Sequence, residues 1–331
     1  MIEAEVLGKD QDLSLGQYLK EWLAHARGRV RTSTYEGYES LIRCYAVPAL
    51  GTIPLSELSP LDVQRLYSSL LEPGRRLSAG TVLNLHLVLT QALGQAVRWG
   101  MLERNPVKGA QPPRPVRPEP VVVDPALACR IVAALSGSAV ELPGILAIAT
   151  GMRRGEILAL RWADLSPDRA HAQVRRTLHA TRRGLQFSEP KTRRSRRAVA
   201  LPAIVRSPLE RQRSEQALRR AADRSWTDLD LVIERGDGRP LNPDTLSSRW
   251  RLFLARSGLP HVRFHDLRHA HATLMLLKGV HPKVVSERLG HASVGITLDL
   301  YSHVLPSMQH DAVRAFDELF GAYGPMHSSG T

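Results

Sequence analysis

The sequence contains few cysteines and no long apolar run. Of its 331 residues only Cys44 and Cys129 are cysteine, and they lie far apart in the chain. This scarcity argues against a disulfide framework and against a cysteine-based zinc site, and it is typical of a reducing compartment. No apolar run approaches the roughly 20 residues that span a bilayer, and residues 1–10 lack the basic-then-apolar form of a signal peptide. We therefore expect a cytoplasmic protein without a membrane partner.

Lysine is also rare, whereas arginine is abundant. Lys plus Arg total 45 against 32 Asp plus Glu, which gives a formal net charge of +13 and a pI near 10.4. Six of the 45 are lysines, so 39 are arginines, whose planar guanidinium suits phosphate oxygens. Such a charge balance favours a polyanionic partner. Hydrophobic residues make up 43% and charged residues 23%, as in ordinary globular proteins.

Hydrophobic spacing predicts a mainly α fold with two domains. Apolar residues at helical spacing predict four helices within 1–105, the second of them over 34–50. Seven prolines between Pro106 and Pro125 then predict an extended linker over 106–124. In the second domain, 125–331, we expect further helices, an amphipathic C-terminal helix over about 306–320, and three short strands of one small antiparallel β-sheet between 171 and 201.

Two stretches of the second domain contain residues suited to binding a phosphate. In ATGMRRGEILALRW, Arg153 follows a glycine turn at a helix start, where side-chain and backbone donors can converge on an anion. The alternative is a solvated arginine paired with Glu156, one helical turn along. In FHDLRHAHATLML, His265 and Arg268 are three residues apart, so they share one helix face and could bind the same phosphate.

The same histidine-rich stretch raises the alternative of a metal site. His265 and His269 are four residues apart, as in the HExxH zinc pair. Asp266 replaces the glutamate of that motif, however, and the sequence offers no convincing third ligand. We therefore expect no metal, and we interpret His269 and His271 as structural or interface residues.

The last stretch, LGHASVGITLDLYSHV, offers a candidate nucleophile. It places His291 ten residues before Tyr301. Of seven tyrosines only Tyr301 and Tyr323 lie beyond the linker, and Tyr323 sits in a glycine-rich tail. If this domain uses a tyrosine nucleophile, Tyr301 is the better candidate.

Taken in order, these stretches resemble the signature sequences of the tyrosine recombinases, particularly the phage-type integrases. The resemblance covers nearly the whole chain and rests on TGMRRGE, HDLRHAHAT and LGHASVGITLDLYSHV together. It implies six catalytic residues: the first arginine Arg153, the hairpin lysine Lys191, the central pair His265 and Arg268, the late histidine His291, and the nucleophile Tyr301.

The resemblance also implies an architecture and partners. It implies a two-domain C-shaped clamp on double-stranded DNA, with a helical core-binding domain at the N-terminus. It further implies a homo-tetramer that exchanges strands between two DNA sites through a 3′-phosphotyrosyl link and a Holliday junction. An excisionase or a host DNA-bending factor would be an additional partner.

The chemistry of a phosphodiester needs these residue types. Cations such as Arg153 and Arg268 would stabilise the charge that gathers on the non-bridging oxygens during attack by Tyr301. Lys191 could protonate the leaving 5′ oxygen as a general acid, and His265 could assist deprotonation of the tyrosine. Because the phosphotyrosine conserves the bond energy, no metal, ATP or other cofactor is expected, and no GxxxxGK[ST] loop is found.

Many arginines surround the expected hairpin. We interpret them as contacts to DNA phosphates, which give affinity without sequence readout. They are Arg175, Arg176, Arg182, Arg183, Arg193, Arg194, Arg196 and Arg197.

The sequence thus predicts a site-specific DNA recombinase that integrates or excises a phage or other mobile element. Four alternatives remain open. They are a chromosomal or plasmid dimer-resolving recombinase, a type IB topoisomerase, a metal-dependent nuclease, and a non-catalytic DNA-binding regulator derived from a recombinase.

Overall fold

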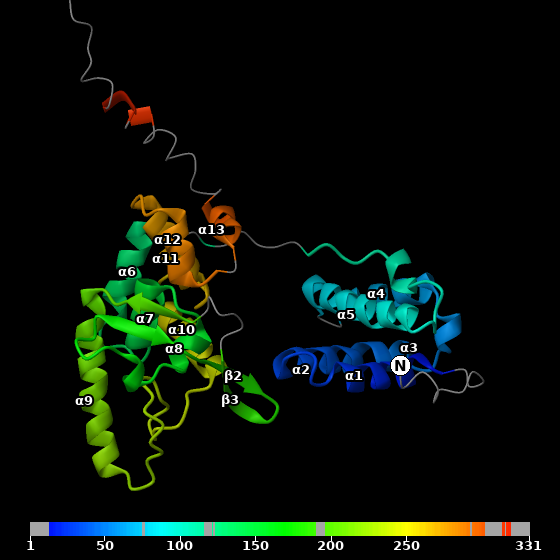
Figure 1. The fold of residues 1–331 in the computed structure, drawn as a ribbon, viewed down its shortest axis with the longest axis horizontal. Helices are drawn as coiled ribbons and strands as arrows, with labels where there is room; N and C mark the ends of the chain where they lie inside the picture. Colours follow the sequence, from blue (N-terminus) through cyan, green and yellow to red (C-terminus); the bar gives the residue numbers. More distant parts are fainter. Residues whose placement is uncertain are drawn as a thin grey trace, which may run out of the picture. The chain divides into compact units, whose positions relative to one another are not determined.

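The computed structural model describes residues 13–74, 77–115, 121, 123–189, 196–291, 293–301, 313–314 and 316–318, without the side chains at 296 and 299–301. The chain divides into two compact units, Met1–Glu119 and Pro120–Thr331 (Figure 1), and each is described by itself. The fold is mainly α with small antiparallel sheets, as expected from the sequence.

The described part of the first unit is helical. Ser14 and Ser59 begin two of its helices with capping boxes, in which the serine hydroxyl accepts from a backbone N–H three residues on. A π-turn at Ile42–Ala46 joins α2 to α3, so residues 32–50 form one helical stretch and the four predicted helices are confirmed. The α-helices are α1 (Leu15–Ala26), α2 (Thr32–Leu41), α3 (Val47–Leu50), α4 (Pro60–Leu71) and α5 (Ala79–Arg98).

The core of this unit extends further along the chain than the expected linker boundary. Tyr18 of α1 is fully buried, and its hydroxyl donates to the Ala92 carbonyl of α5 over 2.6 Å. A 3-10 turn at Pro106–Gly109 then places Val107 and Ala110 in the same core. Residues 106–110, which the prolines of 106–125 place in the expected linker, therefore pack against the first unit.

The second unit builds its core around helices α7 and α10. Trp250 of α10 is buried against Phe253 and Phe264, and its indole N–H donates to the Val262 carbonyl over 2.7 Å. The α-helices are α6 (Pro125–Leu135), α7 (Glu141–Thr150), α8 (Arg154–Leu158), α9 (Arg206–Ala222), α10 (Pro243–Arg256), α11 (Asp266–Leu277), α12 (Pro282–Leu289) and α13 (Val294–Tyr301). Helices α11, α12 and α13 lie together at one end of the unit (Figure 1).

The strands differ from the prediction of one sheet with three strands. Arg175 and Arg176 interrupt the first predicted strand, and the described residues form two separate antiparallel pairs. In the first pair, β1 (His171–Val174) lies against β4 (Arg197–Ala200). In the second, β2 (Thr177–Thr181) and β3 (Gly184–Ser188) form a hairpin that projects from the unit (Figure 1).

The C-terminal helix expected over 306–320 falls mostly outside the described residues. Residues 313–314 and 316–318 are helical, and Val313 and Phe316 are exposed there. Within the described part of the chain, no helix is both long enough and apolar enough to cross a membrane.

Candidate active site

Among the predicted site residues whose side chains the structure describes, Arg268 is the most buried. Its side chain on α11 is 3% exposed, and its Nη1 donates to the Gly151 carbonyl over 2.6 Å and its Nη2 to the Leu289 carbonyl over 2.8 Å. Burial, followed by the nearby Arg153, lowers the pKa of Arg268 to about 9. The guanidinium is therefore still charged at neutral pH, and its orientation is fixed by two backbone oxygens.

Gly151 shapes the place where Arg268 is anchored. It ends α7 with a φ of +67°, a conformation that L side chains rarely adopt. A Cβ at this position would lie 2.4 Å from Leu289 Cδ2 and 2.8 Å from His271 Cδ2. Glycine is thus required both for the turn and for the close approach of α11 and α12 to the end of α7.

Two further basic side chains bind carbonyls at the end of α7. His271 Nδ1 donates to the Ile148 carbonyl over 2.9 Å, while its Nε2 accepts from Arg288 Nε over 3.0 Å. Arg288 Nη2 also donates to the carbonyls of Ala149 and Ala200, the latter in β4. The C-terminal end of a helix carries partial negative charge, so it stabilises the cations that gather here.

Arg153 is the N-cap residue of α8 and is more accessible than Arg268. Its backbone N–H donates to Glu156 Oε2 over 2.9 Å, and its Nη1 donates to Glu156 Oε1 over 2.8 Å. Its Nη2 lies 3.5 Å from the Gly290 carbonyl, next to His291. The side chain is 39% exposed, which leaves guanidinium donors open to a ligand.

Glu156 joins Arg153 to a third arginine. The carboxylate is 3% exposed and also accepts from Arg197 Nη2 over 2.9 Å and Nη1 over 3.3 Å. Burial alone would raise the pKa of Glu156, but Arg197 and Arg153 outweigh it and lower that pKa. Arg197 is itself 6% exposed, so the structure places it in the interior beside Glu156 rather than on the phosphate-facing surface expected from the sequence.

His291 lies on the loop between α12 and α13. Gly290 ends α12 with a φ of +69°, and His291 Nδ1 is hydrogen-bonded to the hydroxyl of buried Thr297 over 2.9 Å. Partial burial, then Arg268 and Arg153, lowers the pKa of His291 to about 4. The imidazole is therefore neutral at pH 7.

His265 stands at the N-terminus of α11, with access to solvent. The protein atoms around its ring, then His269 and Arg268, lower its pKa to about 4. The rings of His265 and His269 meet edge to face with centroids 5.1 Å apart, and His269 Nδ1 is buried without a hydrogen-bond partner. Among the described residues no group of three or more His, Cys, Asp or Glu is arranged to hold a metal ion.

The structure therefore brings four of the six predicted catalytic residues together and positions the backbone of a fifth. Arg153, His265, Arg268 and His291 surround the junction of α7, α8, α11 and α12. Helix α13 packs against α11 and α12 and ends at Tyr301, whose side chain lies outside the described residues. Lys191 also lies outside them, in the 190–195 segment between β3 and β4.

The arginines assigned to DNA contacts have different surroundings. Arg176 Nη1 donates to buried Asp164 over 2.7 Å, and Arg175 lies 3.9 Å from the same carboxylate with its side chain 61% exposed. Arg196 pairs with the exposed Glu189 at 2.6 Å. Arg182 and Arg183 are exposed at the tip of the β2–β3 hairpin, whereas Arg193 and Arg194 fall outside the described residues.

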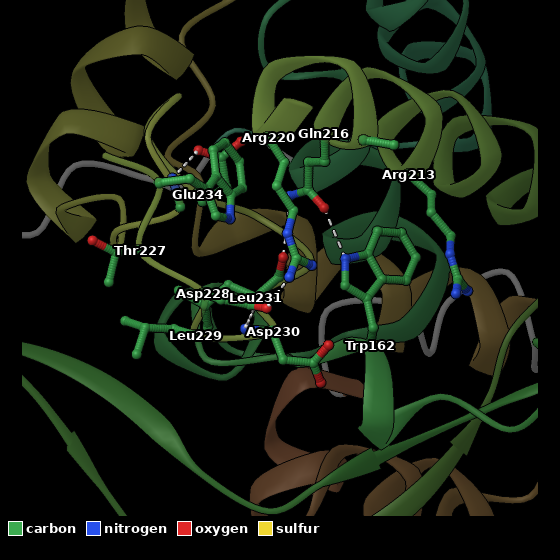
Figure 2. Close-up of a pocket in the computed structure, with 13 residues that line it drawn as sticks. Trp162, Arg213, Gln216, Arg220, Thr227, Asp228, Leu229, Asp230, Leu231 and Glu234 are labelled. Atoms are coloured by element: carbon green, nitrogen blue, oxygen red, sulfur yellow. Dashed lines mark hydrogen bonds and ion pairs between the residues drawn. The ribbon is translucent and has the colours of Figure 1, made fainter. Parts of the chain in front are cut away.

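A separate pocket of about 210 Å³ lies between α9 and the loop 226–238 (Figure 2). Its central polar group, Gln216, accepts from the Trp162 indole and donates to the carbonyls of Leu231 and Val232. Arg220, at the rim, pairs with Asp228. Gln216 and Arg220 thus already have partners within the protein, and the pocket shares no residue with the arginine–histidine cluster.

Sequence reasoning named one supporting residue of the cluster, Glu156 as the partner of Arg153, and this pair is present in the structure; it missed the roles of Arg197 and Arg288. Glu156 has a local signal in the sequence, because it lies three residues after the N-cap residue Arg153, which is the spacing of a capping box. Arg197 and Arg288 have no local signal, because their partners lie far away in the chain. Glu156 is 41 residues from Arg197, and His271 is 17 residues from Arg288.

Comparison with known proteins identifies the family to which the chain belongs. A family model described as Phage integrase family matches residues 141–308, and one described as Phage integrase, N-terminal SAM-like domain matches residues 14–71. The chain belongs to the phage integrase family, whose members are site-specific recombinases acting on DNA.

Relatives span most of the chain. It is 29% identical over 332 residues to a tyrosine recombinase XerC-like protein of Caldanaerobacter subterraneus subsp. tengcongensis, and the match covers 94% of this chain and 84% of the relative. It is 24% identical over 319 residues to the ICEBs1 integrase of Bacillus subtilis, with the same coverage.

Solved structures share the fold. The Tn1549 transposon integrase in complex with a circular intermediate DNA superposes with a TM-score of 0.77 at 20% identity, over 92% of this chain and 99% of that one. A lambda integrase dimer bound to a COC′ core site gives 0.65 at 19% identity, over 87% and 95%.

Proposed function

We propose that the chain integrates and excises a phage or other mobile element by cleaving DNA through a covalent 3′-phosphotyrosyl intermediate at Tyr301. The observation that supports this most is the pairing of a buried, doubly anchored Arg268 with the accessible guanidinium of Arg153. Two cations held in this way would stabilise the charge that develops on the non-bridging oxygens of a scissile phosphate. Preorganised donors contribute more to catalysis than mobile ones because no reorganisation is needed during the reaction.

The neutral histidines supply the remaining polar groups. With a pKa near 4, His265 is unprotonated at pH 7 and can accept the proton that leaves the Tyr301 hydroxyl. His291, oriented by Thr297, can hydrogen-bond a phosphate oxygen. Lys191 is assigned the role of general acid, since a lysine can give up its proton to the 5′ oxygen whereas an arginine holds its own too tightly.

Strand exchange then follows from the covalent intermediate. Tyrosine oxygen forms a bond to phosphorus while the bond to the 5′ oxygen breaks, and Lys191 protonates that oxygen. A 5′ hydroxyl from a second strand attacks the phosphotyrosine, releases the tyrosine and restores a phosphodiester. No metal or nucleotide cofactor takes part.

The proposed partners are DNA sites and further copies of the chain. We assign residues 1–105 to core-site binding, together with 106–110, which pack on the same core; the rest of the expected 106–124 linker joins them to the catalytic residues 125–331. A lambda integrase tetramer bound to a Holliday junction, with a TM-score of 0.65 at 18% identity, supports a homo-tetramer on two DNA sites. An excisionase or a host DNA-bending factor would set direction, and the reaction would take place on DNA in the bacterial cytoplasm.

The test is capture of covalent protein–DNA adducts from fragmented genomic DNA in EDTA, for the wild type and for Tyr301→Phe. Adducts at discrete sites with the wild type only would support the proposal and recover the target. DNA binding without adducts would favour a non-catalytic regulator, and cleavage that EDTA stops would favour a metal-dependent nuclease. Exchange between two copies of a chromosomal or plasmid site would instead favour a dimer-resolving recombinase.

A further inference from the structure

Arg197 occupies a position that the expected catalytic set does not explain. It is the first residue of β4 and directly follows Arg196. Lys191 precedes both residues in the connection between β3 and β4. The Arg197 side chain does not face solvent, because 94% of its surface is covered and its guanidinium lies against Glu156. Its Nε donates to the Arg288 carbonyl in α12 over 2.6 Å, so one side chain joins β4, α8 and α12.

The Glu156 carboxylate accepts hydrogen bonds from two arginines. Oε1 accepts from Arg153 Nη1 at 2.8 Å and from Arg197 Nη1 at 3.3 Å. Oε2 accepts from the Arg153 backbone N–H at 2.9 Å and from Arg197 Nη2 at 2.9 Å. Arg197 thereby occupies positions at the carboxylate that the Arg153 guanidinium could otherwise take, and of the guanidinium nitrogens of Arg153 only Nη1 is bonded to Glu156.

We propose that Arg197 is a positioning residue for strand cleavage: by sharing the Glu156 carboxylate, it holds the Arg153 guanidinium in the orientation that binds the scissile phosphate. The inference rests on the proposed recombinase function. Without Arg197, each carboxylate oxygen loses one hydrogen bond and gains a position for the Arg153 side chain, although Oε2 still accepts from the Arg153 backbone N–H. A buried carboxylate with a single remaining cation is a strong competitor for that cation, so the phosphate would lose a donor.

The experiment measures single-turnover adduct formation on the DNA site recovered from the wild type, with protein in excess. Arg197→Met removes the charge and keeps side-chain length, and Glu156→Gln/Arg197→Met removes the competing carboxylate as well. Arg219→Met is the matched control, because Arg219 pairs at 2.9 Å with Glu234, another buried carboxylate of the second unit, away from the cluster. Thermal unfolding of each full-length variant shows what is lost in stability alone.

We expect Arg197→Met to form adducts about 100-fold more slowly, the scale of a misplaced catalytic group, while its affinity for the DNA site is unchanged. The double variant should cleave faster than Arg197→Met, and Arg219→Met should cleave as the wild type does despite a lower melting temperature.

Three results would overturn the inference. They are a wild-type rate in Arg197→Met, a loss of DNA affinity that equals its loss of rate, and a double variant no faster than the single one. A wild type that forms no adduct would contradict the proposed function instead, so the two failures are distinguishable.

Discussion

Replacing Gly151 with alanine should damage both stability and cleavage. The residue has a φ of +67°, and left-handed backbone costs an L residue about 1–2 kcal/mol. The new Cβ would also lie 2.4 Å from Leu289 Cδ2 and 2.8 Å from His271 Cδ2. Overpacking of a buried site adds about 1–3 kcal/mol, so the free energy of unfolding of the second unit should fall by about 2–5 kcal/mol.

The effect on cleavage follows from the same contacts. Arg268 is anchored by the carbonyls of Gly151 and Leu289. The extra methyl group would meet the His271 ring, which two hydrogen bonds hold in place, so the backbone at Gly151 has to shift. A shift of about 1 Å in a catalytic group costs on the order of 100-fold in rate. Gly151→Ala should therefore form adducts about 100-fold more slowly on the same DNA site.

The matched control is Gly137→Ala in the same unit. Gly137 has a φ of +71°, but a Cβ there would meet nothing within 4 Å. The free energy of unfolding of Gly137→Ala should fall only by about 1–2 kcal/mol, the cost of left-handed backbone to an L residue. This variant should retain the wild-type cleavage rate. Calorimetric unfolding of the full chain and single-turnover adduct assays measure both effects. Equal losses in the two variants would refute the argument that Gly151 is needed for close packing around Arg268.

Three further predictions concern other residues of the site. Burial and then Arg288 lower the pKa of His271 from 6.5 to about 4, so between those pH values the unfolded chain binds a proton that the folded chain does not. The free energy of unfolding should consequently fall as the pH drops from 6.5 to 4, by up to about 3 kcal/mol, and denaturant titrations of His271→Gln should show a shallower fall. Arg268→Lys should reduce adduct formation by about 100- to 1000-fold, because one ammonium cannot reproduce the planar fork that binds two carbonyls; a smaller loss in single-turnover assays would argue against the anchoring role. Lys191→Met should cleave ordinary DNA slowly but recover on a substrate with sulfur in place of the leaving 5′ oxygen, since a thiolate leaves without protonation, and an absence of recovery would remove Lys191 from the acid role.

The fold was largely predictable where local signals were strong. Apolar residues at helical spacing predicted the helices of the first unit, because this signal acts within a few residues. The serine cap at Ser59 and the glycine that ends α12 are local signals of the same kind. The pairing of the strands was harder to predict from the sequence. Arg175 and Arg176 interrupt an alternating pattern, and only tertiary contacts decide that β1 pairs with β4 rather than with β3.

The residues of the site likewise fall into those with a local sequence signal and those placed only by tertiary contacts. Arg153, His265, Arg268 and His291 could be selected from motifs because each motif is local, and the structure brings these four together. Arg197 could not be distinguished from its neighbours by sequence, since eight arginines lie in the same region and only its burial against Glu156 separates it from the exposed ones. Likewise, nothing in the sequence indicated that the end of α7 binds His271, Arg288 and Arg268 through its carbonyls.

The most direct test of the account is to identify the residue that becomes attached to DNA. Adducts trapped on the recovered site in EDTA would be digested with protease and nuclease, and the modified peptide located by mass spectrometry. A nucleotide should be joined through its 3′ phosphate to Tyr301, with adducts absent in Tyr301→Phe and retained in Tyr323→Phe. A nucleotide attached to Tyr323 or to any other side chain, or cleavage by Tyr301→Phe, would contradict the assignment of Tyr301 as the nucleophile.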